Sequence, residues 1–71
     1  TMDKDEVKSF LRFLETASWS ELLDRQAKLR TILAVVANDN VKADATFCLR
    51  LVDEEIAVRV QTNALLRENR P

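Results

Sequence analysis

Apolar residues recur along this chain at the three- and four-residue spacing of amphipathic α-helices, in three successive runs. The apolar positions of the first run are Val7, Phe10, Leu11, Leu14 and Ala17. Asp3 followed by Glu6 has the spacing of a capping box, in which side chains satisfy the free N–H groups at a helix start. The first run therefore predicts a helix over residues 4–16.

Ser18 breaks this run, and Ser18 with Glu21 forms a second capping-box pattern. The apolar stripe that follows is Leu22, Leu29, Leu33 and Val36. It predicts a second helix over residues 19–37. Asparagine tolerates the left-handed conformation that ends helices, so residues 38–40 (Asn-Asp-Asn) predict a turn, in which Asp39 or Asn40 caps the next helix. Such a short link places the second and third helices antiparallel.

The third run, residues 41–69, contains neither glycine nor proline and predicts a helix roughly 40 Å long. Its apolar residues are Val41, Ala45, Cys48, Leu49, Val52, Ile56 and Leu66, flanked by Phe47, Leu51, Val58 and Leu65 on one side and by Val60 on the other. This arc covers more than half of the circumference, whereas a helix that packs on one side needs about 100°. We therefore expect neighbours on two sides: the preceding helices, and a second copy or a partner.

A β-hairpin is the alternative for residues 47–61, because apolar and polar residues also alternate there on both sides of an acidic turn. That turn lacks the glycine or asparagine that tight hairpins favour. Arg50 with Glu54, and Glu55 with Arg59, have the i, i+4 spacing of helical ion pairs. The pattern favours the helix.

Polar residues interrupt the apolar face of the third helix at Glu55, Arg59 and Asn63. In an interface such residues set register and partner choice at a cost in stability. Alternatively their polar ends extend to solvent while their stems cover apolar surface. Trp19 is either a core residue or an interface residue. Arg30 either lies at the rim of an interface or has its guanidinium group hydrogen-bonded within the chain. The candidate interface residues are Trp19, Arg30, Val52, Glu55, Ile56, Arg59 and Asn63.

Composition narrows the possible functions. The 71 residues include no glycine, no histidine and one cysteine, and the net charge is −1. Without glycine no phosphate-binding loop is expected, and without histidine or further cysteines no zinc-type site. Charges of both signs are mixed along the chain, which argues against a broad nucleic-acid-binding surface. We expect no enzyme activity, no cofactor and no small-molecule substrate. The sequence has no apolar run long enough for a membrane span. We expect no signal peptide, and the lone cysteine favours a cytoplasmic protein.

Together these patterns predict an all-α fold: an antiparallel helical hairpin with a short leading helix, one domain over residues 1–71, forming a homodimeric helical bundle. Two hairpins would pair through Val52, Ile56 and their neighbours. A remaining apolar groove would receive a helix of a target protein, so that the protein binds and masks its partner.

The capped hairpin over residues 18–69, free of glycine and histidine, resembles small phage- or plasmid-encoded helical anti-activators, which inhibit bacterial quorum-sensing transcription regulators. The resemblance lies in architecture alone and assigns no residue a role. It implies a transcription regulator as the partner.

Two other functions fit the sequence. A helix-turn-helix-like DNA-binding regulator would present Arg25, Lys28 and Thr31 of the second helix to the groove, although Glu21 and Asp24 share that side. A structural subunit, in which the homo-oligomer is itself the function, is the second alternative.

Overall fold

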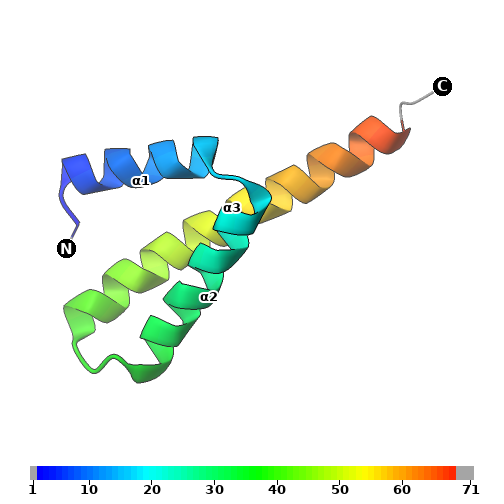
Figure 1. Cartoon of the computed structure of the whole chain (residues 1–71). Helices are drawn as coiled ribbons and strands as arrows, with labels where there is room; N and C mark the ends of the chain where they lie inside the picture. The colour runs from blue at the N-terminus through cyan, green and yellow to red at the C-terminus, as the bar shows by residue number, and fades with distance from the viewer. Residues whose placement is uncertain (1, 69–71) are drawn as a thin grey trace.

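The computed structural model describes residues 2–68, which form three helices and no strand. These are α1 (Lys4–Thr16), α2 (Trp19–Val35) and α3 (Asp39–Glu68), as Figure 1 shows. The predicted all-α fold is confirmed. The β-hairpin alternative for residues 47–61 is wrong, because α3 runs through that segment without interruption.

Side chains cap the first two helices where the sequence predicts them. The Asp3 carboxylate accepts the Glu6 N–H at 2.9 Å and begins α1. The capping box of α2 is complete: Ser18 Oγ accepts the Glu21 N–H at 3.1 Å, and Glu21 Oε1 accepts the Ser18 N–H at 2.9 Å. These bonds satisfy donors that the first turn of a helix leaves free.

The link between α2 and α3 differs from the prediction. Helix α2 ends at Val35 instead of Ala37, and Val36 is extended (φ −76°, ψ 137°); no residue among 2–68 has the left-handed conformation expected of the turn. Asn38, not Asp39 or Asn40, caps α3, because its Oδ1 accepts the N–H groups of Asn40 (2.9 Å) and Val41 (3.1 Å). The expected helix end at residue 69 lies outside the described residues.

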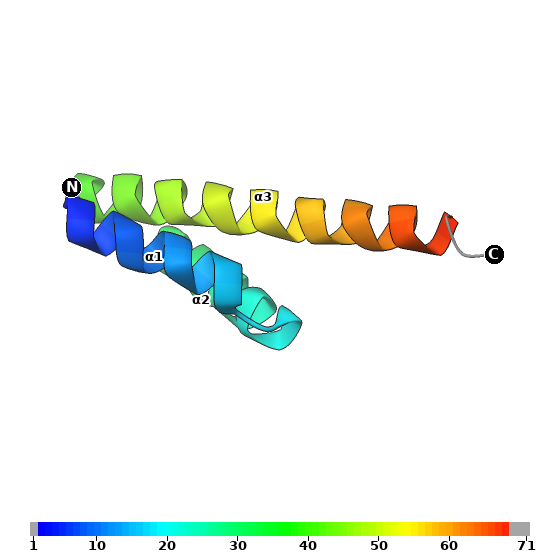
Figure 2. The ribbon, with the colours of Figure 1, turned by 90° about the horizontal axis from the view of Figure 1, so that it is seen from above.

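Helices α1 and α2 lie on the same side of α3 (Figure 2). The three-residue link makes α2 antiparallel to α3. Helix α1 runs in the same direction as α3, since Met2 contacts Cys48 near one end of α1 and Leu14 contacts Arg59 near the other. Among residues 2–68, none packs against the opposite side of α3.

The core lies where α1 and α2 meet α3. Its buried residues are Phe10, Leu14, Ala17, Leu22, Leu29, Ala45, Cys48 and Val52. Val52 is 0% exposed, because both preceding helices cover its face of α3. The expectation that two hairpins pair through Val52 is therefore wrong: this side chain belongs to the core of its own chain.

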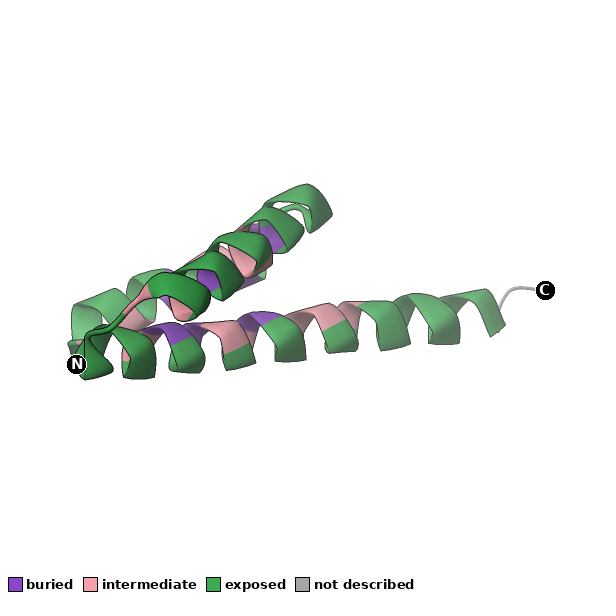
Figure 3. Cartoon of the chain, turned by 90° about the horizontal axis from the view of Figure 1, so that it is seen from below, coloured by how far each residue is buried: buried purple, intermediate pink, exposed green. Residues whose placement is uncertain are grey.

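The C-terminal part of α3 projects beyond the other two helices. No residue from Val60 to Glu68 is buried or half-buried, as Figure 3 shows. The radius of gyration is 14.3 Å and the extents are 52 × 26 × 15 Å, whereas a compact chain of this length has a radius of gyration of about 11 Å. We call residues 60–68 the projecting end.

Candidate protein-interaction surfaces

Arg59 joins α3 to the C-terminal end of α1. Its Nη1 donates to the carbonyl oxygen of Ala17 at 2.7 Å and its Nη2 donates to that of Leu14 at 2.9 Å. Its Nε donates to Glu55 Oε2 at 2.8 Å, which confirms the helical ion pair that the spacing indicates. We call this arrangement the Arg59 clamp.

The clamp follows from the chemistry of both partners. The last carbonyl groups of a helix have no partner within it, and a guanidinium group presents several N–H donors in a planar fork. Arg59 can therefore bind two carbonyl oxygens and a carboxylate at once, which a lysine ammonium does with less geometric precision. The polar end of Arg59 thus binds α1 instead of extending to solvent.

A groove between α1 and α3 runs beside the clamp. Its lining residues are Leu11, Leu14 and Glu15 from α1 and Leu51, Glu54, Glu55 and Val58 from α3. The floor is apolar, and the charged residues of the lining are all glutamates. Glu55 is neutralised in part by Arg59, but Glu15 and Glu54 are exposed. We call this surface the acidic groove.

The apolar stripe of the acidic groove continues onto the projecting end. Leu51, Val58 and Leu65 follow one another at seven-residue steps, which places them on one face of α3. Val58 and Leu65 are 56% and 54% exposed. An apolar row of this length on a helix surface is typical of a face that packs against another helix.

A second surface lies on the α2 side of the projecting end. It is lined by Trp19, Val60, Asn63, Ala64 and Arg67, and we call it the Trp19 face. Trp19, at the start of α2, is 45% exposed, and Val60 is 53% exposed. Two of the candidate interface residues, Trp19 and Asn63, therefore meet here.

The other candidate residues are placed differently. Arg30 is exposed on α2 and lines neither surface. Ile56 is half-buried and packs against the core. Gln26 of α2 donates to Asp53 Oδ1 at 2.7 Å and so joins α2 to α3.

Comparisons of the chain with protein-family models, curated proteins and solved structures find no match. The resemblance to anti-activators thus gains no support from relatives.

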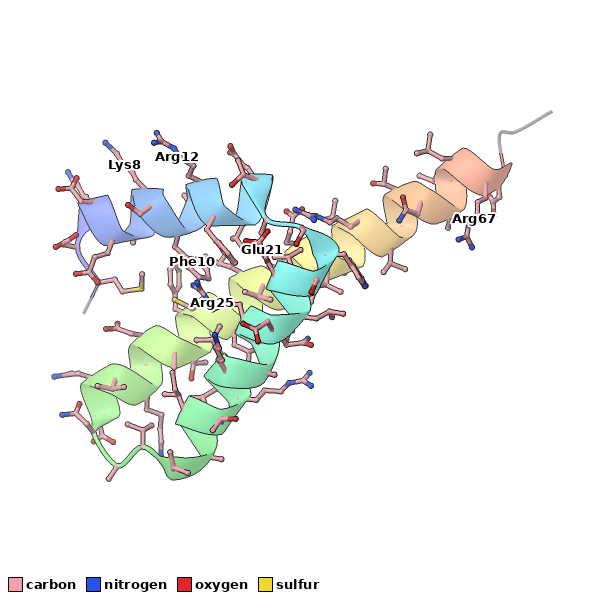
Figure 4. All side chains as sticks on the ribbon, in the orientation of Figure 1. Lys8, Phe10, Arg12, Glu21, Arg25 and Arg67 are labelled. Carbon is pink, nitrogen blue, oxygen red and sulfur yellow. The ribbon has the colours of Figure 1, made fainter. Side chains whose placement is uncertain are left out.

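The cations expected on a DNA-recognition helix are engaged within the chain. The Arg25 guanidinium lies 4.2 Å from the ring centre of Phe13 and 5.9 Å from that of Phe10, a cation–π arrangement between α1 and α2 (Figure 4). Lys28 pairs with Asp24 at 2.9 Å. Lys8 and Arg12 point outward from α1, but they lie on another helix.

Cys48 lies in the core, where its thiol donates to the Met2 sulfur at 3.5 Å. Burial, with a smaller contribution from Asp44, raises the pKa of the thiol, although Arg25 acts in the opposite direction. A thiol held in its neutral form is a poor nucleophile and a poor metal ligand. Among residues 2–68 no group of three or more potential metal-ligating side chains comes together. No helix in the same range is both long and apolar enough to cross a membrane.

Sequence reasoning identified the flank of Leu51, Val58 and Leu65 but not the groove. The helical pattern alone shows that these residues share a side of α3. It does not show that α1 lies next to them, nor that Leu11 and Glu15 complete the lining. The sequence indicated only part of the groove's charge, because Glu54 and Glu55 belong to the acidic run of the third helix.

Proposed function

We propose that this protein is a non-enzymatic interaction module, homodimeric in its working form, that binds an amphipathic helix of a partner protein in the acidic groove and thereby masks that helix. The acidic groove carries the proposal: an apolar floor open to solvent, with exposed carboxylates of Glu15 and Glu54 at its edge.

The side chains that line the acidic groove indicate which kind of helix it binds. Leu11, Leu51 and Val58 offer an apolar strip to the apolar face of a helix. The nearby glutamates favour lysine or arginine at the flanks of that face, and they disfavour acidic flanks through like-charge repulsion. The expected partner therefore presents a basic amphipathic helix.

Basic helices of this kind occur in DNA-binding proteins, which place them in the major groove. A protein that covers such a helix blocks DNA binding. This argument supports a bacterial transcription regulator as the partner, which is also what the resemblance to anti-activators implies, and it suits a protein that works in the cytoplasm.

The test uses two labelled peptides of about 18 residues with the same leucine face, one flanked by lysines and the other by glutamates. Fluorescence anisotropy at low salt measures their binding. We expect the lysine peptide to bind at least about tenfold more tightly, and its affinity to fall as salt is added. Equal binding of the two peptides would contradict the proposal.

Two variants locate the binding site. Val58→Asp places a charge on the apolar floor, and Glu54→Lys reverses a charge at its edge; both are expected to weaken binding of the lysine peptide by about tenfold or more. Thr31→Lys is the control, because Thr31 is exposed on α2 and does not line the acidic groove. A loss of binding in Thr31→Lys as large as in Glu54→Lys would show that only net charge matters.

The DNA-binding alternative has less support. Arg25 and Lys28 are engaged with aromatic rings and with Asp24, so α2 offers few free cations. Tight, salt-sensitive binding of a DNA duplex at low salt would restore it. A purely structural homo-oligomer would bind neither peptide, and Val58→Asp would then alter assembly alone.

A further inference from the structure

The exposed area of this chain exceeds what a compact monomer of its size leaves in water. The accessible surface is 5566 Å² for 8.1 kDa, whereas a compact protein of that mass exposes about 4,500 Å². The difference, on the order of 1,000 Å², is comparable to the roughly 800 Å² that each partner buries in a stable protein–protein interface. The projecting end accounts for the elongation.

The Trp19 face is the part of the projecting end suited to self-association. Val60, Asn63, Ala64 and Arg67 follow the i, i+3, i+4, i+7 spacing of one helix face. Leu66, 62% exposed, adjoins this face. The small side chain of Ala64 permits close approach of a second helix, and Trp19 supplies a large apolar surface at its side.

We propose that a second copy of this chain packs against the Trp19 face, with the two projecting ends antiparallel about a twofold axis next to Asn63. This proposal rests on the proposed homodimer and names its interface. Each Asn63 side chain then lies beside its symmetry mate, where two amides can hydrogen-bond and set the register. The same operation brings Leu66 of each copy toward Trp19 and Val60 of the other.

Charge is compatible with this register. In an antiparallel pair centred on Asn63, Arg67 of one copy lies opposite Arg59 of the other. Arg59 is already neutralised by Glu55 and bound to the carbonyl groups of α1, so the repulsion is reduced. The acidic groove lies on the other flank of α3, so the dimer keeps two grooves open for partner helices.

Cysteine cross-linking tests the register directly. In a Cys48→Ala background, Asn63→Cys places one thiol at the proposed axis, and Gln61→Cys places one on the far side of the same helix. A disulfide needs Cα atoms within about 7 Å. We expect oxidised glutathione to convert the Asn63→Cys protein to a covalent dimer and to leave the Gln61→Cys protein monomeric. Equal cross-linking of both would overturn the proposal.

Two matched valine variants separate this proposal from the proposed function. Sedimentation equilibrium of Val60→Asp should show a dimer dissociation constant raised by about tenfold or more, with lysine-peptide binding retained. Val58→Asp should show the reverse: an unchanged dimer and lost peptide binding. Both side chains are more than half exposed, so both variants keep their helices, which circular dichroism checks.

Other results would overturn the interface. If the wild-type chain is monomeric at tens of micromolar, the self-association is wrong, while Val58-dependent peptide binding would still support the masking function. If Val58→Asp separates the copies and Val60→Asp does not, the two chains pair through the acidic groove instead.

Discussion

The guanidinium of Arg59 lies 2.7 Å from the carbonyl oxygen of Ala17, the C-cap residue of α1, although 42 positions separate the two in sequence. The bond, with its companion to Leu14, makes α3 the C-terminal cap of another helix. Capping by a distant arginine replaces the glycine-based motif that commonly ends helices, which a chain without glycine does not have.

Replacement of Arg59 by methionine should destabilise the protein by about 2 kcal/mol, because two carbonyl groups lose a charged donor while the aliphatic stem is kept. Urea unfolding followed by circular dichroism measures the change. Arg50→Met, on an exposed part of α3, is the control and should change stability by less than about 0.5 kcal/mol. Hydrogen exchange in α1 should rise more than in α2 for the Arg59 variant; a uniform rise would contradict the clamp.

Val52→Ala should lower the free energy of unfolding by about 2 kcal/mol, because it removes two buried methyl groups from a site with no exposed surface. The same truncation at Val60 removes methyl groups that are largely in water. Measured at a concentration too low for self-association, Val60→Ala should lower the free energy of unfolding by less than about 0.5 kcal/mol. Equal costs at both positions would show that Val52 is not at the centre of the core.

The capping box of α2 should make stability depend on acid pH. The Ser18 N–H, and then the Ser18 hydroxyl, lower the pKa of Glu21 from its ordinary value of 4.5. The charged carboxylate therefore stabilises the folded state above that ordinary pKa, and the contribution is lost as pH falls through the lowered pKa. The stability difference between wild type and Glu21→Gln should shrink on going from about pH 6 to about pH 3. A stability difference between the two proteins that does not change with pH would contradict the lowered pKa of Glu21.

Cys48 should react slowly with a thiol reagent while the protein is folded. Burial raises its pKa and leaves little surface for attack, so the neutral thiol persists in mildly alkaline solution. Its reaction rate should rise strongly in denaturing urea, approaching that of a free cysteine. A fast reaction of the native protein would mean that α1 opens often enough to expose Cys48.

Local signals in the sequence were sufficient to predict the three helices and the starts of the first two. Ser18 with Glu21, and Asp3 with Glu6, act over three residues, and the spacing of apolar residues reports one helix at a time. Asn38 was missed as the cap of α3 because three neighbouring residues offered similar side chains, and their backbone geometry decided among them.

The candidate surfaces depended on distant contacts that no local pattern reports. The i, i+4 spacing predicted that Arg59 meets Glu55, but its bonds to α1 required knowledge of where α1 lies. Val52 looked suitable for pairing because the width of the apolar arc does not show which part of it the chain covers itself. The acidic groove needs residues from two helices, and therefore became visible only in the fold.

The position of the Arg59 clamp also has a consequence for the order of folding. Helices α2 and α3 are joined by three residues, so their contacts close a short loop. The clamp closes a loop of more than forty residues, which costs more chain entropy before any bond repays it. We therefore expect the hairpin to form first and α1 to dock last, so that the acidic groove is the final part of the molecule to take shape.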